Sequence, residues 1–156
     1  MPISKHLANI RSLVGNRLLC LPSVTGIVRN TRGDILLVRN SGATEWTTPG
    51  GMIEPDDRPA ESVVRELKEE LNIDVNVKSL LGVFSGPEYR MLYPNGDQVV
   101  YTTAVFECEI RSGSPQVDMD ELEECQYVKR ADLAALASPD WVRDLLARLD
   151  AGEMYN

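Results

Sequence analysis

The stretch PGGMIEPDDRPAESVVRELKEELNI, Pro49–Ile73, constrains the fold of this chain more than any other segment. At about 100° per residue, its apolar side chains gather on one face of a helix. These side chains are Ala60, Val63, Val64, Leu67 and Leu71. Glu66, Glu69 and Glu70 fall on a stripe directly beside that face. The stretch therefore predicts a helix that packs one face into a core and carries three carboxylates at the edge of burial.

The crowding of these carboxylates allows two interpretations, because like charges at this helical spacing repel by roughly a few tenths of a kcal/mol per pair. The first is an ordinary solvated face, in which Arg65 pairs with Glu61 or Glu69. The second is a site for a divalent cation, since Mg²⁺ takes carboxylate oxygens together with waters and substrate phosphate. The helix alone leaves both interpretations open.

Length and composition predict one domain. The chain has 156 residues, with 43% hydrophobic and 26% charged residues, which is ordinary for a globular protein and excludes a disordered one. We expect residues 1–156 to form a single domain, with residues 1–20 as an N-terminal helical segment packed on it. No apolar run approaches the roughly 18–20 residues of a membrane span, and the N-terminus lacks the apolar region of a signal peptide.

The net charge and the cysteines indicate in which compartment the protein works and which partners are excluded. The formal net charge of −8 argues against a nucleic-acid partner, because a phosphate backbone needs a basic footprint. Cys20, Cys108 and Cys125 are odd in number and lack C-x-x-C spacing, so we expect reduced thiols rather than disulfides or a zinc site. These features predict a cytoplasmic protein with neither a nucleic-acid nor a membrane partner.

The rest of the chain alternates between helical and strand patterns, which predicts an α/β protein with a mixed sheet. Helices are expected at Ile3–Val14 and over the closing segment SPDWVRDLLARLDAG. Val24–Asn30 and Ile35–Asn40 flank the polar turn TRGD and suggest a hairpin. Shorter or longer strands are expected at TEWTTP, VNVKSLLGVFS, QVVYTTAVFECEI and CQYVKR.

Three local signals mark ends and turns. Asp57 is the expected N-cap of the central helix, and Asn72 is suited to a left-handed C-cap. Asn95-Gly96, in YPNGD, is suited to a type I′ turn before the second long strand.

Residues 51–73 resemble the Nudix box, G-x5-E-x7-R-E-U-x-E-E-x-G-U, where U is a bulky aliphatic residue. The matching positions are Gly51, Arg65, Glu66, Leu67, Glu69, Glu70 and Ile73, and the preceding WTTPGG is similar to the usual approach to the box. Two positions depart from the pattern: Asp57 stands in place of Glu, and Asn72 in place of Gly. The motif is long and strictly spaced, so the chain is identified as a member of the Nudix hydrolase family.

The resemblance implies the Nudix fold, an α/β/α sandwich around a mixed β-sheet, and hydrolysis of a nucleoside diphosphate linked to another group with Mg²⁺ or Mn²⁺. Glu66 and Glu70 would be the main metal ligands, and Glu69 would share a second ion or orient water. A carbonyl of the Gly50-Gly51 loop would supply a further oxygen, with Gly50 as the expected ligand. Arg65 would hold the carboxylates by bidentate pairing.

Other site residues are carried by weaker signals. The acidic stretch DMDELEEC is either a solvated loop or the source of a further ligand or general base, for which Glu121 is the first choice and Glu124 the second. Arg39, Arg90 and Tyr93 are candidates for substrate binding, against the alternative that each is surface structure.

The substrate expected from the resemblance is ADP-ribose or a similar nucleoside diphosphate sugar, because the whole chain looks closer to the bacterial ADP-ribose pyrophosphatase-like branch than to the branch that sanitises oxidised purine triphosphates. The first alternative is a nucleoside triphosphate, oxidised or not. The second is a non-catalytic nucleotide-binding or regulatory module, for which the substitution at Asp57 is the best argument. A homodimer is a candidate assembly.

Overall fold

The computed structural model describes residues 4–156. The helices are α1 (Lys5–Val14), α2 (Pro59–Leu71) and α3 (Asp140–Ala151), with 3₁₀ segments η1 (Pro87–Tyr89) and η2 (Arg130–Ala135). The strands are β1 (Leu19–Val28), β2 (Ile35–Asn40), β3 (Trp46–Thr47), β4 (Gly50–Met52), β5 (Asp74–Phe84), β6 (Arg90–Leu92), β7 (Gln98–Ser112) and β8 (Leu122–Val128). Within the described residues, no helix has the length and apolar character needed to cross a membrane.

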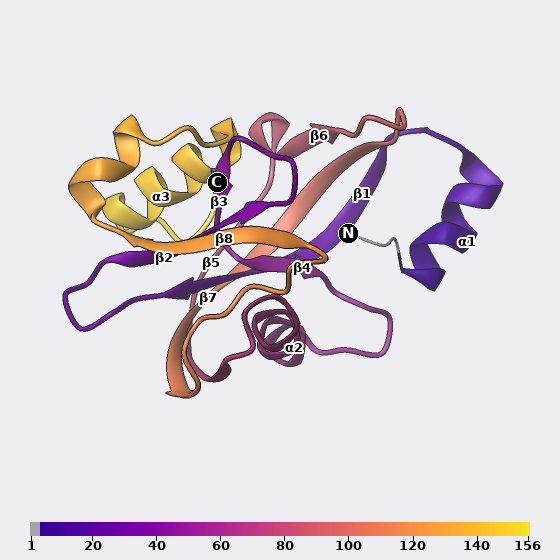
Figure 1. The fold of residues 1–156 in the computed structure, drawn as a ribbon. Helices are drawn as coiled ribbons and strands as arrows, with labels where there is room; N and C mark the ends of the chain where they lie inside the picture. Colours follow the sequence, from indigo (N-terminus) through magenta and orange to yellow (C-terminus); the bar gives the residue numbers. More distant parts are fainter. Residues whose placement is uncertain (1–3) are drawn as a thin grey trace.

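The strands form two sheets, as Figure 1 shows. The larger sheet has the order β4-β1-β7-β5, with β6 also pairing with β7. Strands β1 and β7 run parallel over Leu19–Val28, whereas β4, β5 and β6 pair antiparallel with their neighbours. The smaller sheet is antiparallel, in the order β3-β2-β8. The predicted α/β class with a mixed sheet is confirmed.

Helix α2 covers one side of the sheets and α3 the other (Figure 1). Under α2, Val63, Leu67 and Leu71 pack against strand residues such as Val24 and Phe106. Each such side chain contributes roughly 1.5–3 kcal/mol when fully buried. The helical period of the central stretch is therefore satisfied by a sheet face, as the sequence predicts.

The second core lies under α3. Leu145 and Leu146 of that helix pack with Ile27, Phe84 and Val105, which point to the opposite side of the sheet from Val24. Helices on both sides of a mixed sheet make the α/β/α sandwich that the resemblance implies, and this prediction is confirmed.

Helix α1 packs on residues near the starts of β1 and β7. Leu7 packs on Leu21 and Val99. Arg11 donates to the carbonyl oxygen of Gln98 at 2.9 Å, and its Nε lies 3.3 Å from Asp97 Oδ1. These contacts fix α1 beside the turn between β6 and β7. The predicted helix is found at Lys5–Val14, and Ile3 lies outside the described residues.

The hairpin prediction is wrong. Val24–Asn30 and Ile35–Asn40 are largely extended as predicted, but β1 pairs with β4 and β7, and β2 with β3 and β8. Only an isolated bridge, Arg29 to Ile35, joins them. The ten-residue parallel pairing with β7 takes one edge of β1, and β4 pairs with the other edge at Ser23–Thr25, so β2 approaches only beyond the end of β1.

The local signals have mixed outcomes. Asn72 is the left-handed C-cap of α2, with φ of 53°, as predicted. The N-cap prediction is wrong: the residue at that position is Arg58, and Asp57 instead accepts from Arg65. Asn95 lacks the positive φ that a type I′ turn requires, so Asn95-Gly96 forms another kind of turn, closed by Gly96 N donating to Tyr93 O at 2.8 Å.

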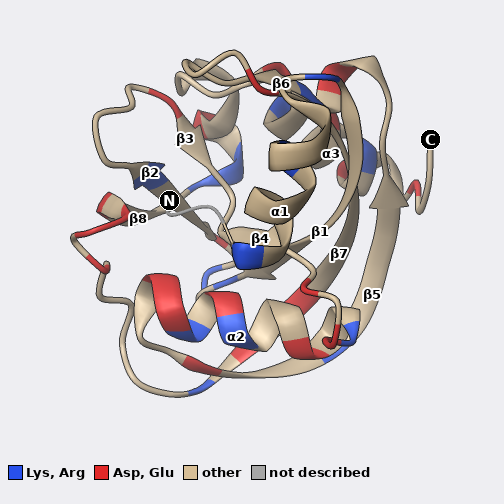
Figure 2. Ribbon diagram, turned by 90° about the vertical axis from the view of Figure 1, so that its right-hand side faces the viewer, with Lys and Arg blue, Asp and Glu red and all other residues tan. Residues whose placement is uncertain are grey.

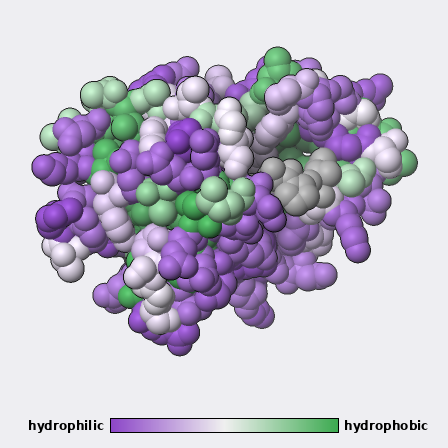
Figure 3. Space-filling model, viewed as in Figure 1, coloured by the Kyte–Doolittle hydropathy of each residue, from purple (hydrophilic) through white to green (hydrophobic). Residues whose placement is uncertain are grey.

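On the face shown in Figure 3, most side chains are hydrophilic, and the apolar ones gather in separate small groups.

Candidate active site

Helix α2 directs Glu66 and Glu70, one turn apart, toward the glycine-rich strand β4. The two residues are buried, at 7% and 3% exposed, because the stripe that carries them borders the apolar face of the helix. Glu69 is on the same stripe but exposed. Figure 2 shows how acidic residues recur along α2. Two of the three carboxylates are thus taken out of bulk water.

The two glycines of β4 have separate roles in receiving these carboxylates. Gly50 has φ of 146°, and its N–H donates to Glu70 Oε2 at 3.0 Å. A Cβ at Gly50 would lie 2.2 Å from the carbonyl oxygen of Val24, so only glycine fits. A Cβ at Gly51 would lie 2.5 Å from the carboxyl group of Glu66. The Gly-Gly pair therefore makes room for one carboxylate and binds the other.

Arg65 connects the carboxylates on the open side of the helix. Its NH1 lies 2.9 Å from Glu66 Oε1 and 3.1 Å from Glu69 Oε2. Its Nε donates to Asp57 Oδ2 at 3.0 Å, and its NH2 to the carbonyl oxygen of Met52 at 3.2 Å. Arg65 therefore orients Glu66 and Glu69 and fastens α2 to the preceding loop.

Burial and mutual repulsion perturb the acids of this site. Burial and, after it, the charge of Glu66 raise the pKa of Glu70 from 4.5 to about 8, while the Gly50 N–H opposes the shift. Burial likewise raises the pKa of Glu66. Charges on Glu69 and Glu121 add to both shifts. The four carboxylates thus lie close enough to repel one another, and a cation among them would relieve that repulsion.

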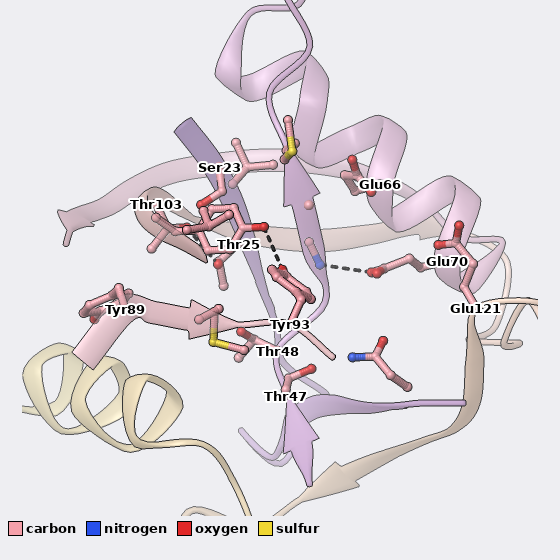
Figure 4. Close-up of a pocket in the computed structure, with 18 of the residues that line it drawn as sticks. Ser23, Thr25, Thr47, Thr48, Glu66, Glu70, Tyr89, Tyr93, Thr103 and Glu121 are labelled. Atoms are coloured by element: carbon pink, nitrogen blue, oxygen red, sulfur yellow. Dashed lines mark hydrogen bonds between the residues drawn. The ribbon is translucent and has the colours of Figure 1, made fainter. Parts of the chain in front are cut away.

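A cavity of about 650 Å³ opens beside the carboxylates. Its walls come from α1, β1, β3, β4, α2, the β6–β7 region and the start of α3. Figure 4 shows Glu66, Glu70 and Glu121 at one end, with Thr25 and Tyr93 on the way to the other. A molecule in this cavity would reach from an acidic end to a region of hydroxyl and aromatic side chains.

The acidic end suits a hard divalent cation in its chemistry. In residues 4–156, no three Asp, Glu, His or Cys side chains converge as a preformed metal cage. The carboxylates of Glu66 and Glu69 face Arg65, and that of Glu70 faces the Gly50 N–H. Mg²⁺ needs only one or two carboxylates with waters and phosphate oxygens. A buried carboxylate with like-charged neighbours and no Lys or Arg partner among the described residues, as at Glu70, fits that requirement.

The structure brings most of the predicted site residues to one cavity. The lining includes Gly50, Arg65, Glu66, Glu69, Glu70, Tyr93 and Glu121. Glu121 lies just before β8 and faces the acidic end, whereas the second choice, Glu124, lies within β8. Tyr93 shares a hydrogen bond of 2.8 Å with the hydroxyl of Tyr101. The roles assigned to these residues remain predictions.

Arg39 and Arg90 do not belong to the lining in the described part of the chain. Arg39 pairs across β2 and β8 with Glu123 at 3.0 Å and Glu124 at 2.9 Å, and its guanidinium lies 5.6 Å from the ring centroid of Trp46. Arg90 donates to the side chain of Gln98. Both arginines thus have partners outside the cavity, and substrate binding by either one stays a prediction.

The sequence interpretation missed a set of hydroxyl side chains in the cavity wall. These are Ser23, Thr25, Thr48 and Thr103. All four residues are buried. Their neighbours in β1 and β7 belong to the hydrophobic cores. For Ser23 and Thr25 a signal was available, since they alternate with Val24 in β1 and alternate positions share one face of a sheet.

Comparisons with known proteins agree with this geometry. The family model described as NUDIX domain matches residues 21–149. An ADP-ribose pyrophosphatase of Methanocaldococcus jannaschii is 31% identical over 140 residues, covering 86% of this chain and 78% of that protein. A solved structure titled UDP-X diphosphatase has a TM-score of 0.70 and 25% identity, covering 99% of this chain and 75% of that one.

Another relative carries a different substrate in its name. An RNA pyrophosphohydrolase of Marinomonas sp. is 38% identical, but over 65 residues. That match covers 42% of this chain and only 40% of the relative. Similarity of this extent concerns less than half of either chain.

Proposed function

Because the chain belongs to the Nudix hydrolase family, we propose that it hydrolyses the pyrophosphate bond of a nucleoside diphosphate derivative, with ADP-ribose or a similar nucleoside diphosphate sugar as substrate and Mg²⁺ or Mn²⁺ as cofactor. The observation that carries the proposal is the buried pair Glu66 and Glu70 at one end of a cavity of about 650 Å³. A buried acidic pair beside a large cavity suits a phosphorylated ligand only together with cations.

The residues of α2 and β4 would prepare the acidic end. Glu66, Glu69 and Glu70 would hold the cation, with the Gly50 carbonyl as a further oxygen donor. When bound, a divalent cation neutralises diphosphate oxygens, polarises phosphorus–oxygen bonds and acidifies bound water. The Gly50 N–H keeps Glu70 in place.

Arg65 and Glu121 would act on either side of that group. Arg65 keeps Glu66 and Glu69 oriented through its ion pairs of 2.9 and 3.1 Å. Glu121 lines the cavity beside Glu70 and is our candidate for the base that takes a proton from the attacking water. No described residue needs to form a covalent intermediate in this scheme.

Two features favour a diphosphate over a triphosphate. The relative named as an ADP-ribose pyrophosphatase aligns over 86% of this chain, whereas a relative of Bacillus subtilis named as a putative 8-oxo-dGTP diphosphatase aligns over 41% of it. Among the described lining residues, the cations are Arg11 and Arg65, and both are occupied by carboxylates. A third phosphate would need further positive charge in the cavity.

The alternative of a non-catalytic binding module rests on Asp57 in place of Glu. In the structure Asp57 accepts directly from Arg65 at 3.0 Å and from Ser62 at 3.3 Å. The shorter side chain therefore retains the same charge and a contact to the box arginine. This favours an enzyme over a binding module.

The test is hydrolysis of ADP-ribose with Mg²⁺ by the wild type and by Glu66→Gln, with chelator as a further control. We expect AMP and ribose 5-phosphate from the wild type, none with chelator, and a rate lower by about 100-fold in the variant. Glu61→Gln removes a carboxylate that lies on the same helix but is exposed and outside the lining, so this matched variant should keep its activity. Equal rates for wild type and Glu66→Gln at limiting Mg²⁺ would contradict the proposal.

A further inference from the structure

Two strands place hydroxyl groups side by side in the cavity wall. Ser23 and Thr25 lie two residues apart on β1, and Thr103 lies on β7, where it pairs in register with Ser23. Val24, between the two, packs under α2. Strand alternation therefore gives one face to the core and the other to the cavity. Figure 4 shows Ser23, Thr25 and Thr103 together, away from the acidic end.

The hydroxyl groups of Thr25 and Thr103 carry two hydrogens, and the hydrogen bond between them uses only one. Their oxygens lie 2.9 Å apart, and either one can be the donor. One O–H hydrogen lies in that hydrogen bond, and within residues 4–156 these two side chains make no other hydrogen bond. The pair can therefore donate one further hydrogen bond and accept others.

Thr48 adds a hydroxyl with no partner. It follows β3, lines the same cavity, and is 5% exposed. Its Oγ1 is buried without a hydrogen-bond partner in the described structure. Buried polar groups without a partner are uncommon in native proteins, because leaving one unpaired is unfavourable. A hydroxyl of this kind in a cavity wall points to a ligand that completes it.

The hydroxyl wall, which we define as Thr25, Thr48 and Thr103, is uncharged. The cations in the lining lie elsewhere, with Arg65 on α2 and Arg11 on α1 engaged by Asp97 and by the carbonyl oxygen of Gln98. A phosphate at the hydroxyl wall would lack a counter-charge. A sugar hydroxyl would not need one, and it donates and accepts hydrogen bonds just as a threonine hydroxyl does.

We propose that the hydroxyl wall is a subsite that hydrogen-bonds the sugar hydroxyls of the substrate, and that Thr48 determines specificity for a sugar at that position. This inference rests on the proposed function and extends it from the diphosphate to the neutral part of the molecule. The acidic end would hold the pyrophosphate, and the hydroxyl wall would select what is attached to it.

The test is calorimetric binding, with Mg²⁺, of the α,β-methylene analogue of ADP-ribose, which keeps both sugars and resists hydrolysis. Thr48→Val keeps the shape of the side chain and removes the hydroxyl. We expect its Kd to rise by about 3- to 10-fold, the range for one neutral hydrogen bond. Thr48→Ser should stay within about twofold, because it keeps the hydroxyl. The matched control is Thr102→Val. Thr102 precedes Thr103 on β7, is exposed and lies outside the lining.

A second readout separates binding from structure. Thr48→Val removes a buried hydroxyl that has no partner in the described residues, so its Tm without ligand should be unchanged or higher while its affinity falls. Binding of α,β-methylene ADP, which lacks the second sugar, tells the two sugars apart. If the wall holds the second sugar, Thr48→Val leaves this Kd unchanged, and if it holds the nucleoside ribose, the Kd rises equally.

The failures of the two proposals are distinguishable. If the wild type binds the ADP-ribose analogue and Thr48→Val binds it equally well, the subsite is overturned and the proposed function stands. If affinity and Tm of Thr48→Val fall together, and Thr48→Ser does not restore them, the residue is structural and the subsite is also overturned. If the wild type binds neither analogue, the proposed function fails, and the sugar subsite fails with it.

Discussion

Replacing Glu70 by glutamine should stabilise the metal-free protein in mildly alkaline solution. Glu70 is 3% exposed, and burial together with the charge of Glu66 raises its pKa from 4.5 to about 8. A carboxyl whose pKa is higher in the folded state than in the unfolded state opposes folding when it ionises. Its favourable contribution is complete below the unfolded pKa of 4.5 and is lost as pH rises through the folded value of about 8.

The magnitude follows from that shift. Near pH 8 the wild type would lose about 4 kcal/mol of unfolding free energy at this one residue, since each pKa unit corresponds to about 1.4 kcal/mol. Glutamine keeps the size of the side chain and can still accept from the Gly50 N–H, but it carries no charge. Near pH 4 the carboxyl is mostly protonated in both states, so the gain from Glu70→Gln should vanish.

The assay is urea unfolding of the wild type, Glu70→Gln and Glu69→Gln with chelator, near pH 8 and near pH 4. Glu69→Gln removes the same charge from an exposed position of the same helix and should change stability by less than about 1 kcal/mol. Mg²⁺ should raise the stability of the wild type near pH 8 and have a smaller effect on Glu70→Gln. Equal unfolding free energies of wild type and Glu70→Gln at both pH values would refute the reasoning.

Three further predictions test individual contacts. Asp57→Glu should keep ADP-ribose turnover within about tenfold, because Asp57 already pairs with the box arginine, and a rise from no turnover to robust turnover would instead indicate a binding module. Glu121→Gln should lower turnover more than Glu123→Gln, because Glu121 lines the cavity while Glu123 pairs with Arg39. Equal and negligible effects of the two variants would indicate that the acidic stretch is only a solvated loop. Gly51→Ala should fold with a Tm close to that of the wild type, but its turnover should be lower by about tenfold or more, because its Cβ would meet the Glu66 carboxyl. Unchanged turnover would show that Glu66 can move without loss of activity.

The sequence predicted the central helix well because two independent constraints agree there. The apolar period requires Val63, Leu67 and Leu71 to face a core, and Asn72 ends the helix with a conformation that few other residues adopt. The acidic stripe then has one possible position, at the border of that core. Burial of Glu66 and Glu70 follows from the same wheel that places the leucines.

The sequence predicted pairing between strands poorly, because partners far apart in the chain leave no local signal. Strand β1 pairs with β7, about eighty residues away, instead of forming the hairpin with β2 that the TRGD turn suggests. The salt bridges of Arg39 depend on the same kind of pairing, between β2 and β8. The contact between Thr25 and Thr103 likewise depends on the register of the parallel pairing, which the sequence does not indicate.

The capping error has a physical reason as well. Asp57 is suited by type to cap a helix, but Arg65, two turns further on, offers a charged partner at 3.0 Å. A charge-assisted hydrogen bond of this kind is stronger than one to a neutral backbone N–H. The N-cap position is accordingly taken by Arg58, one residue after Asp57.

The most direct test of the central claim is the ratio of kcat/KM for ADP-ribose to kcat/KM for 8-oxo-dGTP, measured on the wild type with Mg²⁺ under identical conditions. A cavity with an acidic end, a neutral hydroxyl wall and no unoccupied cation among its described lining residues predicts a ratio well above one. A ratio clearly below one would contradict the assignment of a nucleoside diphosphate sugar as substrate. If the wild type hydrolyses neither compound, the proposed pyrophosphatase activity is contradicted.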